Sequence, residues 1–463
     1  MSSIRAFFSP RDMSQGRPWK RIIEFAIPML IGNIAQQLYN TADSIIVGIY
    51  VGDNALAAVG SAAPILNLLL ALFIGVSTGA GILVAQSFGA KDRARLSQVV
   101  GNSITLTLIV SAAIMALGAL FTRPLLSLLN TPISIYAWAA DYLTIFFLGI
   151  AGFAFYNIFS GILRGMGDSF SALLFLLVAA ALNVVLDLWF VAGLGMGVPG
   201  VALATIISQF ISAILCFIKL KSMDNVVSLR WKLLRPVKSS IGQIVRLGVP
   251  SGITQAIFSM AMLVVQSLTN SFGETFIACN VIVMRVDGFA MMPNFTFGET
   301  MATFTGQNVG AGRLDRIKKG TLQGTLIAVG TATVITSLLL FVGPMLMGVF
   351  TDTQYLIDYS ARMMRILAVG YIAIAVTQSL SGVMRGSGNT IIPMWISLIT
   401  TVVIRVPLAY GIAYFTRSEA NPNGMPECIF ISLLISWVMG ALITSAFYAS
   451  GIWKKRLKKN MRV

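Results

Sequence analysis

The sequence predicts an all-α membrane protein with twelve transmembrane helices in two six-helix lobes, related by a pseudo-two-fold axis along the membrane normal. The first observation is composition: the 463 residues are 56% hydrophobic and only 11% charged, with a mean hydropathy of +0.83. A water-soluble core does not need that much apolar sequence. The second observation is a series of long apolar segments, and the third is a likeness between the two halves of the chain.

Each of twelve apolar segments is long enough, at about 20–30 residues, to cross ~30 Å of hydrocarbon. Lipid offers the backbone no hydrogen-bonding partners, so the segments are expected to be helices. The first follows a polar, basic stretch that does not resemble a signal peptide. The predicted helices cover residues 22–50, 55–87, 97–121, 133–157, 169–193, 200–220, 241–270, 276–308, 318–342, 356–380, 390–415 and 427–452.

Matching glycine motifs mark several helix ends. The second and eighth helices end at "QSFGAKDRAR" (86–95) and "QNVGAGRLDR" (307–316), and the fourth and tenth at "SGILRGMGDS" (160–169) and "SGVMRGSGNT" (381–390). Glycine after a helix permits a tight turn into the next element. Arginine in the last turn is favoured there by the helix dipole. We interpret both motifs as structural.

Loop charges give the orientation. Of the 33 Lys and Arg residues, 26 fall in alternate loops and at the two chain ends, five lie within predicted helices, and only Arg123 and Arg417 lie in loops of the opposite side. The positive-inside rule then predicts a multi-pass protein of the cell membrane with both termini in the cytoplasm. The net charge of +16 is explained by loops that face anionic lipid, so nucleic acid is not an expected partner.

The motif pairs lie 220–222 residues apart, which indicates an internal repeat. Each half holds an even number of helices, so both halves start on the same side of the membrane, as parallel repeats do. The predicted organisation is a cytoplasmic segment (1–21), an N-lobe (22–220), a cytoplasmic linker (221–240), a C-lobe (241–452) and a basic tail (453–463). Pro28 and Pro250 are paired by the repeat, and each is expected to act as a hinge because proline removes a helical hydrogen bond.

The motifs resemble those of a known family when they are taken in their order along the chain. "PMLIGNIAQQLYNTADSIIVG", "VAQSFGAKD", "SGILRGMGD" and "LNVVLDLWFVAGLGMGVPGVALAT", with their weak repetition, resemble the MATE (multidrug and toxin extrusion) transporters of the MOP superfamily over essentially the whole chain. The resemblance implies a secondary transporter, not an enzyme, that exports amphipathic organic cations by alternating access in exchange for H⁺ or Na⁺. It also implies an N-lobe cation site whose ligands match Asp43, Asn183, Asp187 and Thr205 in type and spacing.

The carboxylates support the same site on their own chemistry. Asp43 and Asp187 lie well inside predicted helices of the N-lobe, where an ionised side chain is costly and therefore indicates function. Asn183 precedes Asp187 by four residues and shares its helix face. Carboxylate, amide and hydroxyl oxygens suit Na⁺, whereas two neighbouring carboxylates repel each other and favour holding a proton. A buried structural network is the alternative.

The C-lobe does not repeat this site. Val265 and Leu408 occupy the positions that correspond to Asp43 and Asp187, so coupling is expected in the N-lobe alone. Asp287 and Arg285 are two residues apart on one helix and diverge. We expect Asp287 to join a structural ion pair, with Arg405 as the candidate partner. Glu299 is either a buried structural residue or a group that faces the cleft and attracts a cationic drug or exchanges a proton itself.

Substrate contacts are predicted from residue type. Methionine repacks around varied ligands, and aromatic faces attract organic cations, although most such residues are expected to pack or face lipid. The candidate cleft residues are Gln36, Tyr39, Phe153, Tyr156, Met260, Met291, Met292 and Glu299.

Three functions other than drug export are alternatives for this sequence. The main alternative is a lipid-linked oligosaccharide flippase of the same superfamily, which is expected to carry more cationic residues in its cleft than this chain offers. An enzyme is disfavoured because the chain has no histidine and no catalytic motif, and a channel has no use for a carboxylate pair in one lobe. We expect organic cations and membrane lipid as partners, no cofactor, a monomer, and H⁺ rather than Na⁺ as the coupling ion.

Overall fold

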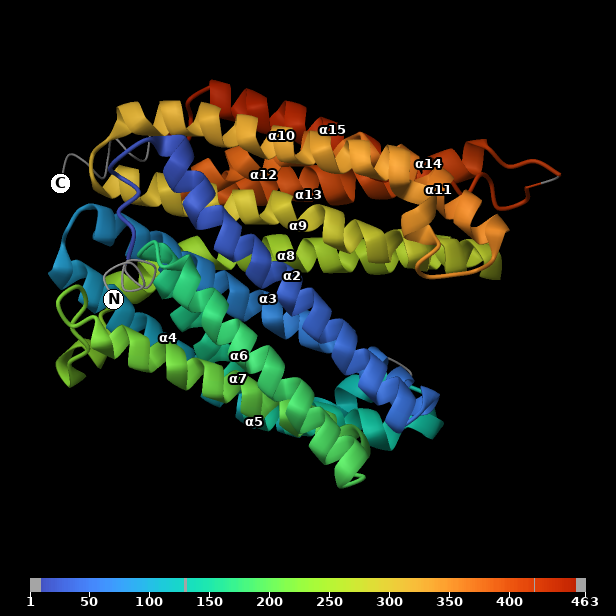
Figure 1. Cartoon of the computed structure of the whole chain (residues 1–463), viewed down its shortest axis with the longest axis horizontal. Coiled ribbons are helices and arrows are strands. Elements are labelled where there is room, and N and C mark those ends of the chain that lie inside the picture. Colours follow the sequence, from blue (N-terminus) through green and yellow to red (C-terminus); the bar gives the residue numbers. More distant parts are fainter. Residues whose placement is uncertain (1–9, 129–130, 420, 455–463) are drawn as a thin grey trace. The chain divides into compact units, whose positions relative to one another are not determined.

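The computed structural model describes residues 10–128, 131–419 and 421–454, and most of these residues are helical (Figure 1). The predicted tail at 453–463 and the predicted N-terminal segment therefore lie partly outside the described residues. In order, the elements are α2 (Pro18–Tyr50), α3 (Asp53–Gly89), α4 (Arg93–Leu128), α5 (Ile133–Gly165), α6 (Ser169–Asp187), η1 (Leu188–Gly193), α7 (Gly197–Ser222), η2 (Trp231–Leu234), α8 (Lys238–Ser271), α9 (Glu274–Gly310), α10 (Leu314–Met347), α11 (Gln354–Ala368), α12 (Gly370–Gly386), α13 (Ile391–Leu398), η3 (Ile399–Arg405), α14 (Val406–Phe415) and α15 (Cys428–Ala449).

These elements account for the twelve predicted spans. Within the described residues, ten helical stretches are long and apolar enough to cross a membrane, and α11 with α12 forms an eleventh that is bent by 42°. α2 adds a helix of 33 residues, about 50 Å long at the helical rise. The predicted fold class is thus confirmed, and the tenth span differs from expectation only in its break between Ala368 and Gly370.

The chain divides into two compact units whose limits differ from the predicted lobes. Unit 1 comprises Met1–Asp12 and Ile27–Gly252, and unit 2 comprises Met13–Ala26 and Ile253–Val463. Hydropathy treats α2 and α8 as single helices, but packing assigns the first part of each to a different unit from the rest. Both divisions fall within two residues of the paired prolines, Pro28 and Pro250.

Close contacts between glycines explain why the start of α8 belongs to unit 1. A Cβ at Gly75 of α3 would lie 2.7 Å from the carbonyl oxygen of Gly248, and one at Gly79 would lie 2.4 Å from the carbonyl oxygen of Ile244. No side chain fits at such distances, so the two backbones are in direct contact. Small residues at membrane helix crossings permit this approach.

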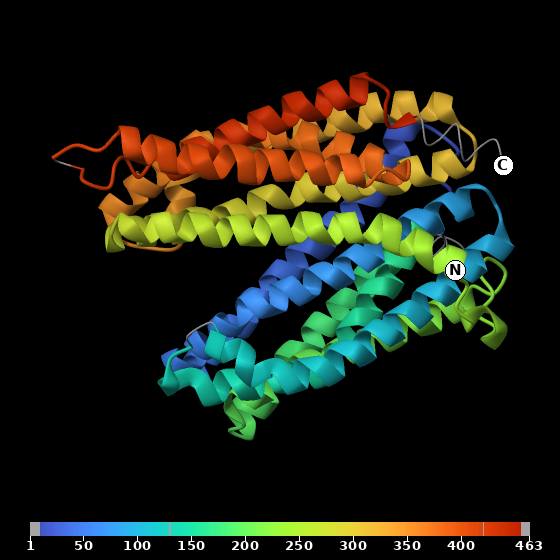
Figure 2. The same ribbon diagram turned by 180° about the vertical axis from the view of Figure 1, so that it is seen from behind.

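The "SGxxRGxG" motif performs two structural tasks. Gly382 and Gly386 place α12 against α9, since a Cβ at either position would lie within 2.3 Å of the carbonyl oxygen of Gly298 or Ala302. Gly388, the last glycine of the motif, has φ +89°, and its repeat partner Gly167 has φ +86°. This left-handed conformation turns the chain out of the helix and strongly favours glycine. Figures 1 and 2 show α9, α10, α12 and α15 running side by side in unit 2.

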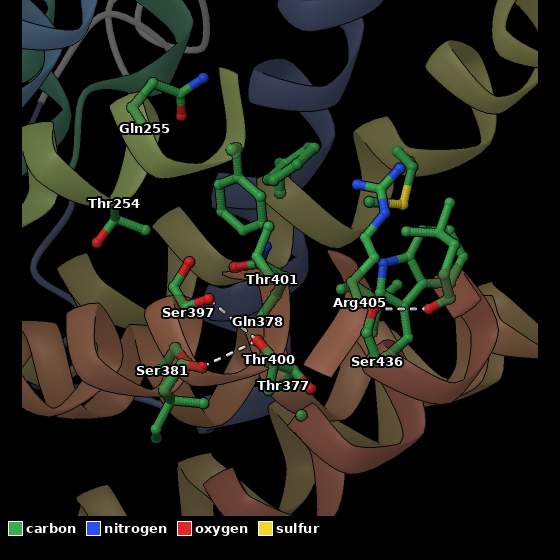
Figure 3. Close-up of a pocket in the computed structure, with 18 of the residues that line it drawn as sticks. Thr254, Gln255, Thr377, Gln378, Ser381, Ser397, Thr400, Thr401, Arg405 and Ser436 are labelled. Atoms are coloured by element: carbon green, nitrogen blue, oxygen red, sulfur yellow. Dashed lines mark hydrogen bonds between the residues drawn. The ribbon is translucent and has the colours of Figure 1, made fainter. Parts of the chain in front are cut away.

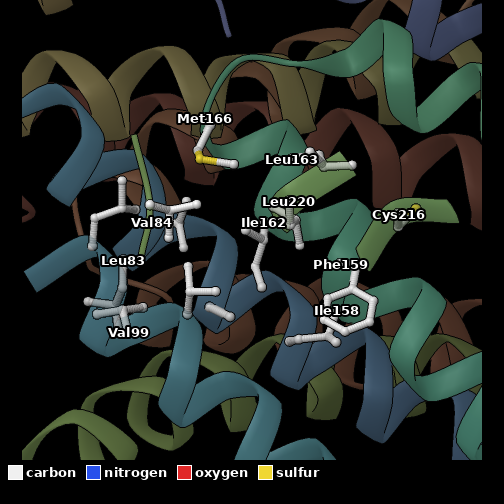
Figure 4. Packing of buried hydrophobic residues seen from close by; sticks show 14 of the residues in the cluster. Leu83, Val84, Val99, Ile158, Phe159, Ile162, Leu163, Met166, Cys216 and Leu220 are labelled. Carbon is white, nitrogen blue, oxygen red and sulfur yellow. The ribbon is translucent and has the colours of Figure 1, made fainter. Parts of the chain in front are cut away.

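Unit 1 has an apolar core built from α3, α4, α5 and α7 (Figure 4). Its members are branched and aromatic side chains that are fully or nearly fully buried, among them Val84, Ile162, Leu163, Cys216 and Leu220. Ile244, from the start of α8, is part of the same cluster. This packing holds α7, one of the helices that carry the candidate site, against α3, α4 and α5.

Candidate functional site

The candidate site in unit 1 is centred on two carboxyl groups. Asp43 lies on α2 and Asp187 is the last residue of α6. Their carboxyl groups are within hydrogen-bonding reach of each other. Asp187 is fully buried and Asp43 is half-buried. Two ionised carboxylates repel at that distance, so this arrangement calls for a proton or a cation between them.

Asn183 and Thr205 complete the group that the sequence predicted. Asn183 lies one turn before Asp187 on α6 and is fully buried. Its side chain bonds to Thr205 Oγ1 of α7 at 3.4 Å. With the amide turned over, it donates to Asp187 Oδ2 at 2.9 Å and accepts from the Thr205 N–H at 3.3 Å. The second orientation satisfies both ends of the amide, so we adopt it.

Three further polar residues lie at the site: Tyr39, which the sequence predicted as a cleft residue, and Gln209 and Tyr142, which it did not predict. Tyr39 of α2 lies near Thr205 and Gln209, and Tyr142 of α5 is buried near both carboxyl groups. Gln209 follows Thr205 by four residues, the same spacing that links Asn183 to Asp187, so helical periodicity contains a signal for it. Tyr142 has no such signal because its position depends on how α5 packs.

The site retains buried oxygen atoms without partners. Asp43 Oδ1, Asp187 Oδ1 and Gln209 Oε1 accept no hydrogen bond from any residue that the structure describes. Buried oxygens of this kind normally find a donor or an ion. Carboxylate, amide and hydroxyl oxygens are ligands for a hard cation, so the residues present suit Na⁺ as well as H⁺.

The predicted cleft residues fall into different surroundings. Gln36 and Tyr156 line a cavity of about 60 Å³ in unit 1, together with Pro28 and Arg164. Phe153 is half-buried and lies with its ring centroid 6.5 Å from that of Phe146.

The predicted methionines lie in unit 2. Met291 lines the larger cavity described below. Met292 is half-buried, and its carbonyl accepts a hydrogen bond from Thr296. Met260 is 64% exposed on α8 and lines neither cavity.

A cavity of about 320 Å³ lies wholly within unit 2 (Figure 3). Asp287, Arg385 and Arg405 are its charged lining residues. Asp287 Oδ1 accepts a 2.7 Å hydrogen bond from the Tyr371 hydroxyl. Tyr371, rather than the expected Arg405, is therefore its direct partner, because α12 brings a tyrosine into contact with α9.

The structure also locates Glu299 and Arg285 of α9. Glu299 lies 3.6 Å from the Arg385 guanidinium, a partner that its sequence neighbourhood does not reveal. Arg285 is exposed and Asp287 is half-buried, as their two-residue spacing implies.

Comparisons with known proteins identify the family and show the same internal repeat. The MatE family profile matches residues 28–189 and 250–411, two stretches that begin at Pro28 and Pro250 and so confirm the internal repeat. The chain is 27% identical over 447 residues to the probable multidrug resistance protein YoeA of Bacillus subtilis, covering 95% of each protein. It is 28% identical to the probable multidrug resistance protein NorM of Thermotoga maritima, covering 94% of this chain and 93% of the relative.

Solved structures agree with the sequence relatives. An outward-facing multidrug resistance MATE family transporter of the MOP superfamily matches with a TM-score of 0.90 at 25% identity, over 97% of this chain and 99% of the other. The two profile matches together span more than half of the sequence. The chain belongs to the MatE family of membrane transporters.

Proposed function

We propose that this protein is a secondary-active efflux transporter that exports amphipathic organic cations in exchange for an inward-moving ion, with H⁺ favoured over Na⁺. The coupling residues are Asp43 and Asp187, supported by Asn183 and Thr205. The relatives named as multidrug resistance proteins support export of foreign compounds.

The observation that carries this proposal is the contact between two carboxyl groups inside the membrane-spanning part of unit 1. A permanently ionised pair is strongly unfavourable there. When one proton is bound, the pair shares it and the repulsion disappears. When the proton leaves, the pair is negatively charged and attracts a cation. A site with these two states binds either the coupling ion or a cationic substrate.

Exchange follows from that competition. The ion binds from outside, neutralises the pair, and lowers the affinity of the N-lobe for the cationic substrate, which leaves outward. In the inward-facing state the ion dissociates and a new substrate binds. The coupling is the difference between the affinities of the two states for each ligand.

Proton coupling is favoured because the two carboxyl groups suffice for it. Sodium requires several oxygen ligands around one centre. In the adopted orientation the Asn183 amide nitrogen donates to Asp187 Oδ2 and the amide oxygen accepts from the Thr205 N–H. That oxygen therefore has less capacity to bind an ion.

Proteoliposomes loaded with a fluorescent organic cation provide the test. A pH gradient and a Na⁺ gradient are imposed separately on wild type, Asp43→Asn and Asp187→Asn. Asp141→Asn is the matched control, since Asp141 is an exposed aspartate of α5. We expect the pH gradient to drive transport in wild type and control, and both site variants to lose at least about 90% of it.

Transport by Asp43→Asn at the wild-type rate under the pH gradient would contradict the assigned coupling site. Transport driven by Na⁺ and lost in the same variants would keep the site and change the ion. No gradient-driven export of any cation by wild type would contradict the proposed function and favour the flippase alternative.

A further inference from the structure

The cavity in unit 2 has a surplus of hydrogen-bond donors that the coupling mechanism does not use. The Nε–H groups of Arg385 and Arg405 and the hydroxyl of Ser397 have no hydrogen-bond partner among the residues that the structure describes. All three residues line this cavity, and Figure 3 labels Arg405 and Ser397. Ser397 is only 7% exposed, so its hydroxyl does not gain a partner from open solvent. Unpartnered buried donors mark a place where an acceptor group can bind.

Arg405 is the arginine of the lining without a direct ion pair in the described part of the chain. Arginine does not lose its proton in proteins, and an arginine in a membrane-spanning segment is expected to have a partner. Glu299 pairs with Arg385, and Asp287 takes its hydrogen bond from Tyr371. No carboxylate of the described residues lies within ion-pair distance of Arg405, although Asp287 attracts it from farther away. The lining includes two arginines and one aspartate, and Arg405 is the arginine whose guanidinium can take an anion as a direct partner.

The local backbone places Arg405 at an irregular point of its helix. Arg405 is the last residue of the π-helical segment η3, and Pro407 follows at the start of α14. Proline has no N–H and interrupts the regular α pattern. π-helical turns are frequently found at functional sites because they redirect a side chain that a regular helix would point elsewhere.

Much of the rest of the lining is apolar. Phe258, Met284, Met291, Phe295 and Trp437 contribute rings and thioethers to it. Such side chains adapt to the apolar body of a ligand. The size, about 320 Å³, falls at the lower end of the range of small-molecule pockets. The cavity therefore combines an apolar surface with donors from α12, α13 and η3.

We propose that this cavity binds an amphipathic ligand through an anionic oxygen group, a carboxylate or a phosphate, and that Arg405 is the residue that recognises the anion. The planar guanidinium presents donors in a geometry that matches both groups. Ser397 supplies an additional donor. This site is separate from the coupling pair of unit 1, so the inference goes beyond the proposed cation export and does not depend on it.

Equilibrium binding of two matched dyes tests the proposal. The probes are a rhodamine with a free carboxylate and the methyl ester of the same dye, titrated by fluorescence anisotropy onto the full chain in phosphatidylcholine nanodiscs without any gradient. We expect wild type to bind the acid more tightly than the ester. Arg405→Gln should weaken binding of the acid at least about tenfold, the effect of losing a charge-assisted bidentate contact, and leave the ester within about twofold.

Three further variants make the outcome decisive. Arg285→Gln removes an exposed arginine of the same unit and should leave binding of both dyes unchanged. Ser397→Ala removes one donor at little risk to folding, and should weaken binding of the acid about threefold without affecting the ester. Asp43→Asn should bind the acid like wild type even though it is expected to lose transport, which separates failure of this proposal from failure of the coupling site.

Competition identifies the natural source of the anion. Displacement of the acid dye by short-chain phosphatidylglycerol, but not by phosphatidylcholine, would assign the anion to a lipid headgroup. Resistance to both would assign it to a small amphipathic acid. Equal binding of acid and ester by wild type overturns the proposal, and so does equal loss of both dyes in folded Arg405→Gln together with an unchanged Ser397→Ala.

Discussion

Single residues in unit 1 differ in what they contribute to an ion site. Asp43 and Asp187 provide the carboxyl groups that hold a proton, whereas Thr205 provides a hydroxyl that only a metal cation needs. Asn183 is intermediate, because it orients Asp187 as well as offering an oxygen. A change at Thr205 therefore separates the two coupling ions without altering the charge of the site.

Thr205→Val tests this distinction because it removes the hydroxyl and keeps the size of the side chain. We expect transport driven by a pH gradient to stay within about twofold of wild type, since the carboxyl pair is intact. A sodium site that lost one of its ligands would need roughly tenfold more Na⁺ for half-maximal transport. Initial rates of organic-cation export in proteoliposomes, at varied pH and varied Na⁺, distinguish the two. A tenfold shift in the Na⁺ requirement would contradict proton coupling.

Residue pairs close in sequence were predictable and distant pairs were not. Asn183 and Asp187 are one helical turn apart, so their common face follows from spacing alone. Glu299 and Arg385 meet through the crossing of α9 and α12, and the same crossing supplies Tyr371 to Asp287. No local pattern encodes that crossing, which explains why Arg405 was expected as the partner of Asp287 and why the partner of Glu299 was not identified.

Among the elements, the fifth and eleventh spans share an irregularity that hydropathy does not report. η1 begins directly after Asp187, and η3 ends at Arg405. In each unit a charged residue of interest therefore stands at the edge of a π-helical segment. Apolar length predicted both spans correctly, but a π turn changes hydrogen-bond register without changing composition, so composition cannot reveal it.

The crossing of α9 and α12 depends on glycines, which leads to a prediction at this scale. A Cβ at Gly382 would lie 2.2 Å from the carbonyl oxygen of Gly298, whereas nothing lies within 4 Å of a Cβ at Gly330 of α10. Gly382→Ala should destabilise the protein by about 1–3 kcal/mol, because the two backbones must separate. Gly330→Ala should be neutral or stabilising by about 0.5–1 kcal/mol, since alanine is the better helix former.

Thermal unfolding of the purified protein, followed by intrinsic tryptophan fluorescence in one detergent, measures both variants. A Gly382→Ala protein as stable as Gly330→Ala would show that α9 and α12 do not approach as closely as their backbone positions require. Equal losses in both variants would point to a general effect of the substitution rather than to the crossing.

In the whole molecule, the boundaries between the two units fall beside the residues that the sequence predicted to be hinges. Pro28 and Pro250 were expected to be hinges, and the family profile begins at both. The division between units falls beside each of them, so each unit includes a short piece of helix continuous with the other unit. The number of helices, the repeat and the position of the carboxyl site were predictable. The exchange of helix pieces between the two units was not predictable, because it arises from tertiary packing at the start of α2 and α8, which hydropathy does not report.

Residues 13–26 lie between the two stretches of unit 1 in sequence but pack in unit 2. Arg316 of unit 2 binds the first residues of this segment. It is 8% exposed and donates to the carbonyl oxygens of Gly16 at 2.7 Å, Met13 at 3.1 Å and Gln15 at 3.3 Å. It also donates to Asn308 Oδ1 at 3.0 Å, which fixes its own orientation. One side chain therefore holds several backbone carbonyls that have no helix to pair with.

Arg316→Ala should release this segment. Loss of these charge-assisted hydrogen bonds is expected to raise the local opening equilibrium on the order of 100-fold, and hydrogen exchange of the backbone amides at residues 13–17 measures it by mass spectrometry. Arg313→Ala is the control, because Arg313 makes an exposed 3.7 Å ion pair with Asp315 and should leave exchange unchanged. Equal exchange in the two variants would mean that the start of α2 is held by helix contacts alone. Faster exchange only in Arg316→Ala would show that one arginine fixes residues 13–17 and the start of α2 within unit 2.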